Sequence, residues 1–190
     1  MKNIEGLIKI RKNEISEIIN ELTSVDFERF DKSQLLQQIL DNKKINCLDE
    51  TNIDNKGVPN PIVDMKPFER GMKKAVVIYT LKAKGSSLII NSVITNTNSY
   101  SCSYNENINE LSIMVYTNYM NPKLNEETKK YVNTKIVEIV DLLNDKIQKK
   151  IIMCNEFNKN LPNVIDKLLI EKETQIKNDL DLNSDLNPFK

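Results

Sequence analysis

The stretch SYSCSYNENINELSIMVYTNY, residues 99–119, carries the clearest structural pattern in the chain. Before its asparagine-rich centre, aromatic residues and a cysteine alternate with serines, and after it aliphatic residues alternate with more polar ones. The apolar members are Tyr100, Cys102, Tyr104, Leu111, Ile113 and Val115. A period of two directs such residues to one face of a strand pair. The stretch therefore predicts a β-hairpin in an antiparallel sheet that is packed on one side only.

Further strands are expected on the N-terminal side of this hairpin. KKAVVIYTLKA, residues 73–83, predicts one strand, and SSLIINSVIT, residues 86–95, predicts a second after a turn at Lys84-Gly85. Residues 41–72 read as a long irregular connection with one short extended piece at 62–65. The sequence thus predicts a small sheet of about four strands.

Helical periodicity flanks the predicted sheet on both sides. Residues 2–22 form an amphipathic pattern, and Phe27 and Phe30 follow as two anchors in a connecting turn. A short helix comes next, with Asp31 or Ser33 as its cap.

A long helix is expected after Pro122, because apolar residues recur every three or four positions. They are Val132, Ile136, Val140, Leu143, Ile147, Ile151, Cys154, Phe157 and Leu161. Pro162 closes or kinks this helix, and a second one is expected to follow it.

These elements predict an α+β fold with N-terminal helices, an antiparallel sheet and long C-terminal helices joined at a proline. Residues 1–121 are expected to contain the first helices and the sheet, and residues 122–178 a long helical pair that packs on it. Residues 179–190 are interpreted as an acidic tail or linker.

Composition argues against several classes of function. The 27 basic and 27 acidic residues balance, so no charge excess drives phosphate binding, and the absence of histidine removes the commonest general base and metal ligand. Three widely spaced cysteines fit neither a disulfide framework nor a common zinc site. No apolar run is long enough to cross a membrane, so a cytoplasmic protein is expected. No motif in the sequence indicates a cofactor, and none is expected.

Asp64-Met65-Lys66 is the one segment that suggests catalysis. A D-x-K spacing ends the metal site of many nucleases, in which two acidic groups hold Mg²⁺ and a lysine polarises water. The second acidic ligand would have to be Asp49, Glu50 or Asp54. The favoured interpretation is that Asp64 and Lys66 are solvated residues beside a short edge segment.

Four tyrosines near the hairpin suggest a second possibility, a surface on which the bases of a single-stranded nucleic acid stack. They are Tyr100, Tyr104, Tyr116 and Tyr119. Because no basic excess surrounds them, packing on the sheet is the favoured explanation.

The order of the elements and a few marks resemble a loosely defined group of long bacterial restriction or antiphage-defence proteins. The marks are Gly85, Leu88, Asn155, Phe157, Asn158 and Leu161, and the resemblance covers residues 1 to about 176. It corresponds to the N-terminal accessory region of those proteins, whose C-terminal half is often a nuclease-type domain. The resemblance implies an accessory or sensing module and assigns no catalytic residue here.

Three functions follow as hypotheses. The first is a non-catalytic protein-interaction or sensing module of a bacterial antiphage-defence system, which binds an effector or sensor subunit or self-associates through its long helices. The others are a small Mg²⁺-dependent nuclease and a single-stranded nucleic-acid-binding protein. Within the tail, Leu186 and Phe189 are possible partner-binding residues, but the favoured interpretation of the tail is a frayed terminus or a linker.

Overall fold

The computed structural model describes residues 3–46, 49–54, 60–68 and 71–186, which fall into two compact units. The sheet unit contains five strands, one short helix and the first part of the long helix, through Ile152. The helical unit contains three N-terminal helices and the long helix from Met153 onward. The predicted α+β class is confirmed, with one strand more than expected.

The sheet is antiparallel throughout and has the order β1-β3-β5-β4. Its strands are β1 (Asn52–Asp54), β2 (Ile62–Pro67), β3 (Lys73–Lys84), β4 (Tyr100–Asn105) and β5 (Glu110–Tyr116). β2 pairs with the first half of β3 and β1 with its last residues, so both lie along the same edge of β3. The predicted hairpin is confirmed as β4 and β5, and the short extended piece as β2.

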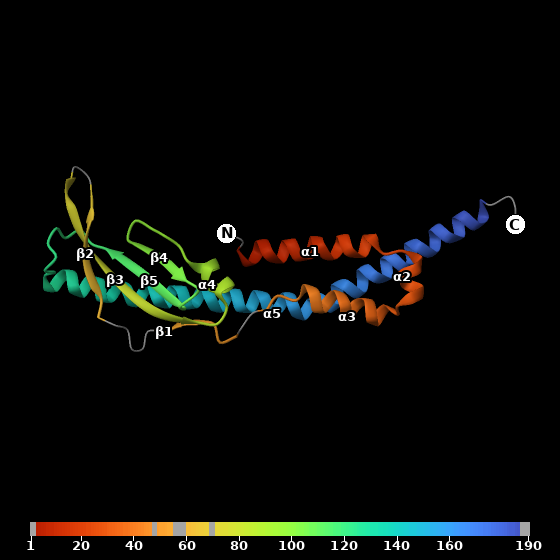
Figure 1. Cartoon of the computed structure of the whole chain (residues 1–190), viewed down its shortest axis with the longest axis horizontal. Helices are drawn as coiled ribbons and strands as arrows, with labels where there is room; N and C mark the ends of the chain where they lie inside the picture. Colours follow the sequence, from red (N-terminus) through yellow and green to blue (C-terminus); the bar gives the residue numbers. More distant parts are fainter. Residues whose placement is uncertain (1–2, 47–48, 55–59, 69–70, 187–190) are drawn as a thin grey trace. The chain divides into compact units, whose positions relative to one another are not determined.

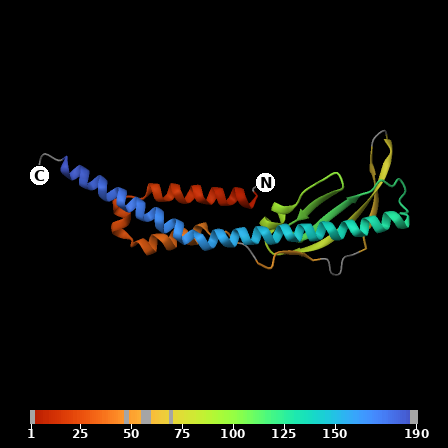
Figure 2. The ribbon, with the colours of Figure 1, turned by 180° about the vertical axis from the view of Figure 1, so that it is seen from behind.

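One face of the sheet is apolar and buried, as the alternation predicts. Across three strands, Tyr79 lies opposite Ile113, and Ile113 lies opposite Cys102. All three side chains are buried. The first part of the long helix α5 (Glu126–Asp185) lies behind the sheet in Figure 1 and in front of it in Figure 2, and therefore covers one face.

The strand predicted at residues 86–95 is wrong, because this segment forms helix α4 (Ser87–Val93). β3 ends just before Gly85, whose φ of +91° is a conformation that residues with a side chain rarely adopt. A Cβ on Gly85 would lie 2.5 Å from the Thr51 Cα, so only glycine fits there. The Ser86 N–H donates to Thr51 Oγ1 at 2.8 Å, which turns the chain away from the sheet. Burial of Ile89, Ile90 and Val93 then holds α4 in place.

The helical unit begins with α1 (Ile4–Glu21), α2 (Ser24–Arg29) and α3 (Lys32–Lys43). The amphipathic first helix is confirmed, and Asp31 caps α3 by accepting from the Gln34 N–H at 2.8 Å. The segment around Phe27 is a short helix, not the expected turn. Thr23 and Asp26 explain this, because the Thr23 N–H donates to the Asp26 carboxylate at 2.8 Å in a capping box.

α5 is continuous through Pro162, so the predicted pair of helices joined at a proline is one helix. Proline lacks an N–H, and the carbonyl of Asn158 four residues earlier therefore receives no helical hydrogen bond from it. An interior proline costs about 3 kcal/mol. Leu161 and Ile165 are buried on either side, and their burial offsets this cost and keeps the helix intact.

The face of α5 that is buried follows the predicted apolar stripe. Val132, Val140, Leu143, Ile147 and Ile151 are buried in the sheet unit, and Cys154, Phe157, Leu161, Ile165 and Leu169 in the helical unit. The helix continues to Asp185, so most of the segment interpreted as a tail or linker is helical. Among the helices that the structure describes, none is both long enough and apolar enough to span a membrane.

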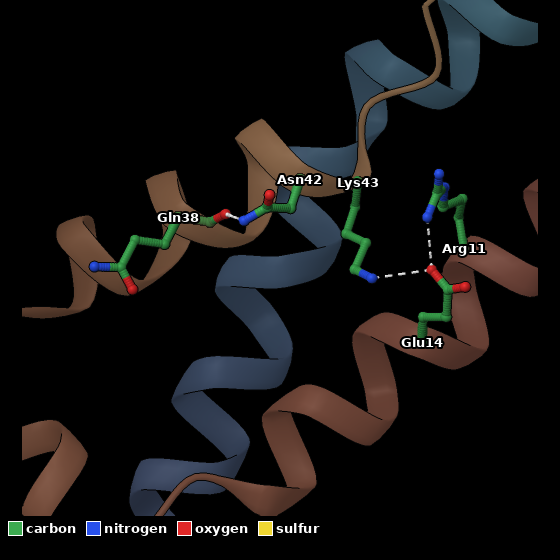
Figure 3. Close-up of polar contacts among 5 residues, drawn as sticks. All are labelled: Arg11, Glu14, Gln38, Asn42 and Lys43. Atoms are coloured by element: carbon green, nitrogen blue, oxygen red, sulfur yellow. Dashed lines mark hydrogen bonds and ion pairs between the residues drawn. The ribbon is translucent and has the colours of Figure 1, made fainter.

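A small ionic cluster joins α1 to α3 (Figure 3). Glu14 Oε2 accepts from Lys43 Nζ at 2.9 Å and from Arg11 Nη1 at 2.8 Å. Beside it, Asn42 Nδ2 donates to the Gln38 carbonyl at 2.8 Å within α3. The hydrogen bonds from Lys43 and then Arg11 lower the pKa of Glu14 below its ordinary value of 4.5.

We expect Glu14→Gln to lower the melting temperature at pH 7 by about 1–3 °C, because the cluster is only partly buried and solvent still screens its ion pairs. A carboxyl group whose pKa is lowered on folding stabilises the protein above its unfolded pKa, and this stabilisation is lost as pH falls through the folded pKa. The difference between the variant and the wild type should therefore shrink as the pH falls below 4.5, the ordinary pKa of a glutamate. Glu17→Gln, an exposed change on the same helix, is the control. A difference that persists unchanged at pH 3 would contradict this assignment.

Candidate functional site

Two asparagines of α5 bind main-chain groups that are distant in sequence. Asn144 Oδ1 accepts from the Ile53 N–H at 2.9 Å, and Asn144 Nδ2 donates to the Ile53 carbonyl at 3.2 Å. Asn158 repeats this arrangement with Ile45, at 3.0 and 2.8 Å. A carboxamide presents an N–H donor beside a carbonyl acceptor, as a peptide group does. Each asparagine therefore pairs with both main-chain groups of one residue.

This geometry gives a structural role to Asn158, one of the marks of the resemblance. Asn158 lies in mid-helix and pairs with the chain that leaves α3, whereas Phe157 is buried beside it. Asn144 has the same role at the outer edge of β1. Both side chains are structural, and Asn144 escaped sequence analysis because nothing local marks its partner 91 residues away.

Asp64 and Lys66 lie on β2 and bind each other. Asp64 Oδ2 is 2.9 Å from Lys66 Nζ, and Asp64 Oδ1 accepts from the Met65 N–H at 2.7 Å. The hydrogen bond from Lys66, followed by that from Met65, lowers the pKa of Asp64. Asp54, one of the acidic partners that a nuclease site would need, is 3.7 Å from Lys84. Within the described part of the chain, no three acidic or cysteine side chains gather closely enough to hold a metal ion.

The cysteines with described surroundings are buried. Burial raises the pKa of Cys102 to about 11, an effect that Lys146 partly opposes. Its thiol is therefore protonated at neutral pH and is a poor nucleophile. Cys154 is also buried, on the apolar stripe of α5, and Cys47 lies outside the described residues.

The four tyrosines do not share one surface. Tyr100 is buried and lies opposite Val115, on the face that α5 covers. Tyr116 points to the opposite face, where its hydroxyl donates to Ser101 Oγ at 3.1 Å. The Tyr104 hydroxyl donates to Asn109 Oδ1 at 2.9 Å within the hairpin. This distribution offers no continuous platform for stacked bases.

Sequence analysis missed a groove of about 590 Å³ between β2, β3 and the start of α5. It is called the β2 groove below. Its apolar lining is Pro61, Val63, Val77, Tyr79, Pro122, Leu124 and Val132, and its polar lining is Lys123, Lys129 and Asn133. Val77 and Tyr79 are buried, whereas Val63 beside them on β2 is 37% exposed. The apolar face of the sheet is thus wider than α5 covers.

Two of the polar residues that line the β2 groove, Lys129 and Asn133, lie in the first turns of α5, and Lys123 lies just before it. Lys129 pairs with Glu126 at 2.7 Å, and the Tyr79 hydroxyl lies 3.4 Å from Asn133 Oδ1. Burial raises the pKa of Tyr79. Lysines but no carboxylates are found among the described residues that line the groove. An apolar segment that carries a carboxylate would match both properties.

A smaller hollow of about 250 Å³ lies in the helical unit. Ile8 and Lys12 of α1 line it together with Phe157, Asn160 and Leu161 of α5. Phe157 and Leu161 belong to the marks of the resemblance, and both are buried. Packing within the helical unit is therefore enough to explain why these two positions are apolar.

Only one of the two tail residues predicted as partner contacts lies among the described residues. Leu186 follows the end of α5 and is 70% exposed. Phe189 lies outside the described residues.

Comparison with protein-family models, curated proteins and solved structures finds no match to this chain.

Proposed function

We propose that this chain is a non-catalytic protein-interaction module that holds an apolar, carboxylate-bearing segment of a partner in the β2 groove. The observation that carries the proposal is the partly uncovered apolar face of the sheet, where Val63 is 37% exposed beside the buried Val77. Exposed apolar surface rimmed by polar groups is typical of protein-binding sites. Lys123 supplies positive charge for a carboxylate of the partner, and Lys129 adds to it when it exchanges its exposed ion pair with Glu126 for that carboxylate.

The setting within a bacterial antiphage-defence system is part of the proposal, and it rests on the sequence resemblance of residues 1 to about 176. In that setting the bound segment belongs to the effector or sensor subunit. The mutual pairing of Asp64 with Lys66 and the dispersed tyrosines favour neither the nuclease nor the nucleic-acid hypothesis.

The test uses a photo-crosslinking amino acid at position 63 in the full-length protein, with position 137 as the control. Val137 is 58% exposed on α5 and does not line the groove. After exposure to an extract of the native host, the partner captured at position 63 is identified, purified and titrated against variants. We expect Val63→Lys to weaken its binding at least about tenfold, because a charge enters an apolar contact, and Val137→Lys to change it less than about twofold.

The proposal fails if positions 63 and 137 capture the same proteins, or if Val63→Lys binds the purified partner as tightly as the wild type. A thermal melt of each variant separates lost binding from lost folding.

A further inference from the structure

β2 presents an open strand edge whose sequence is complementary to itself. β2 pairs with β3 on one side and with no other described strand. The segment from Ile62 to Phe68 has the sequence IVDMKPF, in which an acidic and a basic residue flank Met65 and an apolar residue stands at each end. An unpaired edge is a template for another strand.

The hydrogen-bond pattern of β3 shows which main-chain groups of β2 face outward. The Ala75 N–H donates to the Tyr119 carbonyl at 2.7 Å, and the Ala75 carbonyl accepts from the Thr117 N–H at 3.2 Å. The main chain of Ala75 is thus directed to the side of β3 away from β2. Met65 lies opposite Ala75, so they form a non-hydrogen-bonded pair. The N–H and C=O of Met65 therefore point to the open edge.

From this geometry we propose that two copies of the chain associate by antiparallel pairing of their β2 edges, with Met65 on the two-fold axis. Met65 and the partner's Met65 then exchange two main-chain hydrogen bonds. The Met65 N–H leaves Asp64 Oδ1, its present acceptor at 2.7 Å, for the carbonyl of the partner subunit. The Val63 N–H can donate to the carbonyl of the partner's Pro67. This association goes beyond the proposed partner binding, since it uses the edge of β2 and not the groove.

Charge complementarity selects this register. With Met65 on the axis, Asp64 lies opposite the partner's Lys66 in a non-hydrogen-bonded pair, in which side chains approach most closely. Ile62, which is 63% exposed, lies opposite the partner's Phe68. The neighbouring two-fold registers place Asp64 opposite the partner's Asp64, or Lys66 opposite the partner's Lys66, and like charges disfavour both.

The pairs also use side chains that are accessible in the single chain. Asp64 and Lys66 are each 46% exposed and now form an ion pair within one strand. Pairing of two copies exchanges two such internal pairs for two between chains. Pro67, which has no N–H, removes one possible hydrogen bond on each side and limits the pairing to a short, reversible contact.

The experiment measures the dimer dissociation constant of the full-length protein by sedimentation equilibrium. Asp64→Lys alone and Lys66→Asp alone place like charges opposite each other, and each is expected to raise the dissociation constant at least about tenfold. An equimolar mixture of the two variants faces lysine with aspartate again, and it should dimerise within about threefold of the wild type. The double variant D64K/K66D should do the same.

The mixture separates pairing between chains from the ion pair within a chain, because both single variants lose the internal pair. The proposal is overturned if the wild type remains monomeric at about 1 mM, a concentration at which weak dimers are detected. It is equally overturned if either single variant dimerises like the wild type, or if the mixture stays monomeric. Both positions lie on an exposed edge, and melting curves confirm that each variant is folded.

Discussion

Ile147→Asp is expected to destabilise the sheet unit by about 4 kcal/mol or more. Ile147 is fully buried on the face of α5 that covers the sheet. An aspartate there loses apolar burial and brings a carboxylate into a site without water. Since small domains are stable by only about 5–15 kcal/mol, this one change removes much of the stability of the unit. Urea unfolding followed by circular dichroism measures the loss.

Lys149→Asp is the matched control, two residues along the same helix. Lys149 is exposed, so its replacement should alter the unfolding free energy by less than about 0.5 kcal/mol. Equal costs for the two substitutions would refute the assignment of the buried face of α5. Ile147→Val should fall between them, at about 0.5–1.5 kcal/mol.

Asn158→Ala is expected to cost the helical unit about 2–4 kcal/mol. The substitution removes both hydrogen bonds to the main chain of Ile45. Because Ile45 is only 4% exposed, water cannot easily take the place of the asparagine. A buried main-chain group left without a partner costs about 1–3 kcal/mol. Urea unfolding gives the total, and amide hydrogen exchange at Ile45 reports the lost bond directly.

Two further variants sharpen this experiment. Asn158→Asp keeps an acceptor for the Ile45 N–H but has no donor for the Ile45 carbonyl, so its exchange protection at Ile45 should exceed that of the alanine variant. Asn163→Ala, an exposed change on the same helix, should be nearly neutral. Unchanged exchange at Ile45 in Asn158→Ala would show that the asparagine does not hold this segment.

Some features of the candidate functional site could be predicted from nearby residues in the sequence, whereas others depend on distant ones. Asp64 and Lys66 stand out in the sequence as a D-x-K spacing, and their ion pair needs only one strand. The β2 groove has no such signal, because it exists where α5 leaves Val63 partly exposed. How much of a sheet its covering helix leaves exposed depends on how the two pack together, and no local sequence pattern shows it.

The sequence by itself determined the elements whose cause is periodic and local. The β4–β5 hairpin follows from alternation of apolar residues, and the stripe of α5 from recurrence at three and four positions. Both patterns survive folding because each residue is directed by its immediate neighbours along the chain.

Only the tertiary structure decided the elements whose cause lies far away in sequence. The Ser87–Val93 segment is a short apolar run that forms a helix. It does so because Thr51 packs against Gly85 and accepts a hydrogen bond from the Ser86 N–H, so the chain turns away from the sheet after β3. α5 passes through Pro162 because flanking side chains are buried. Asn144 and Asn158 find their partners 91 and 113 residues away. Such contacts form only when folding brings distant segments together, and no local pattern records them.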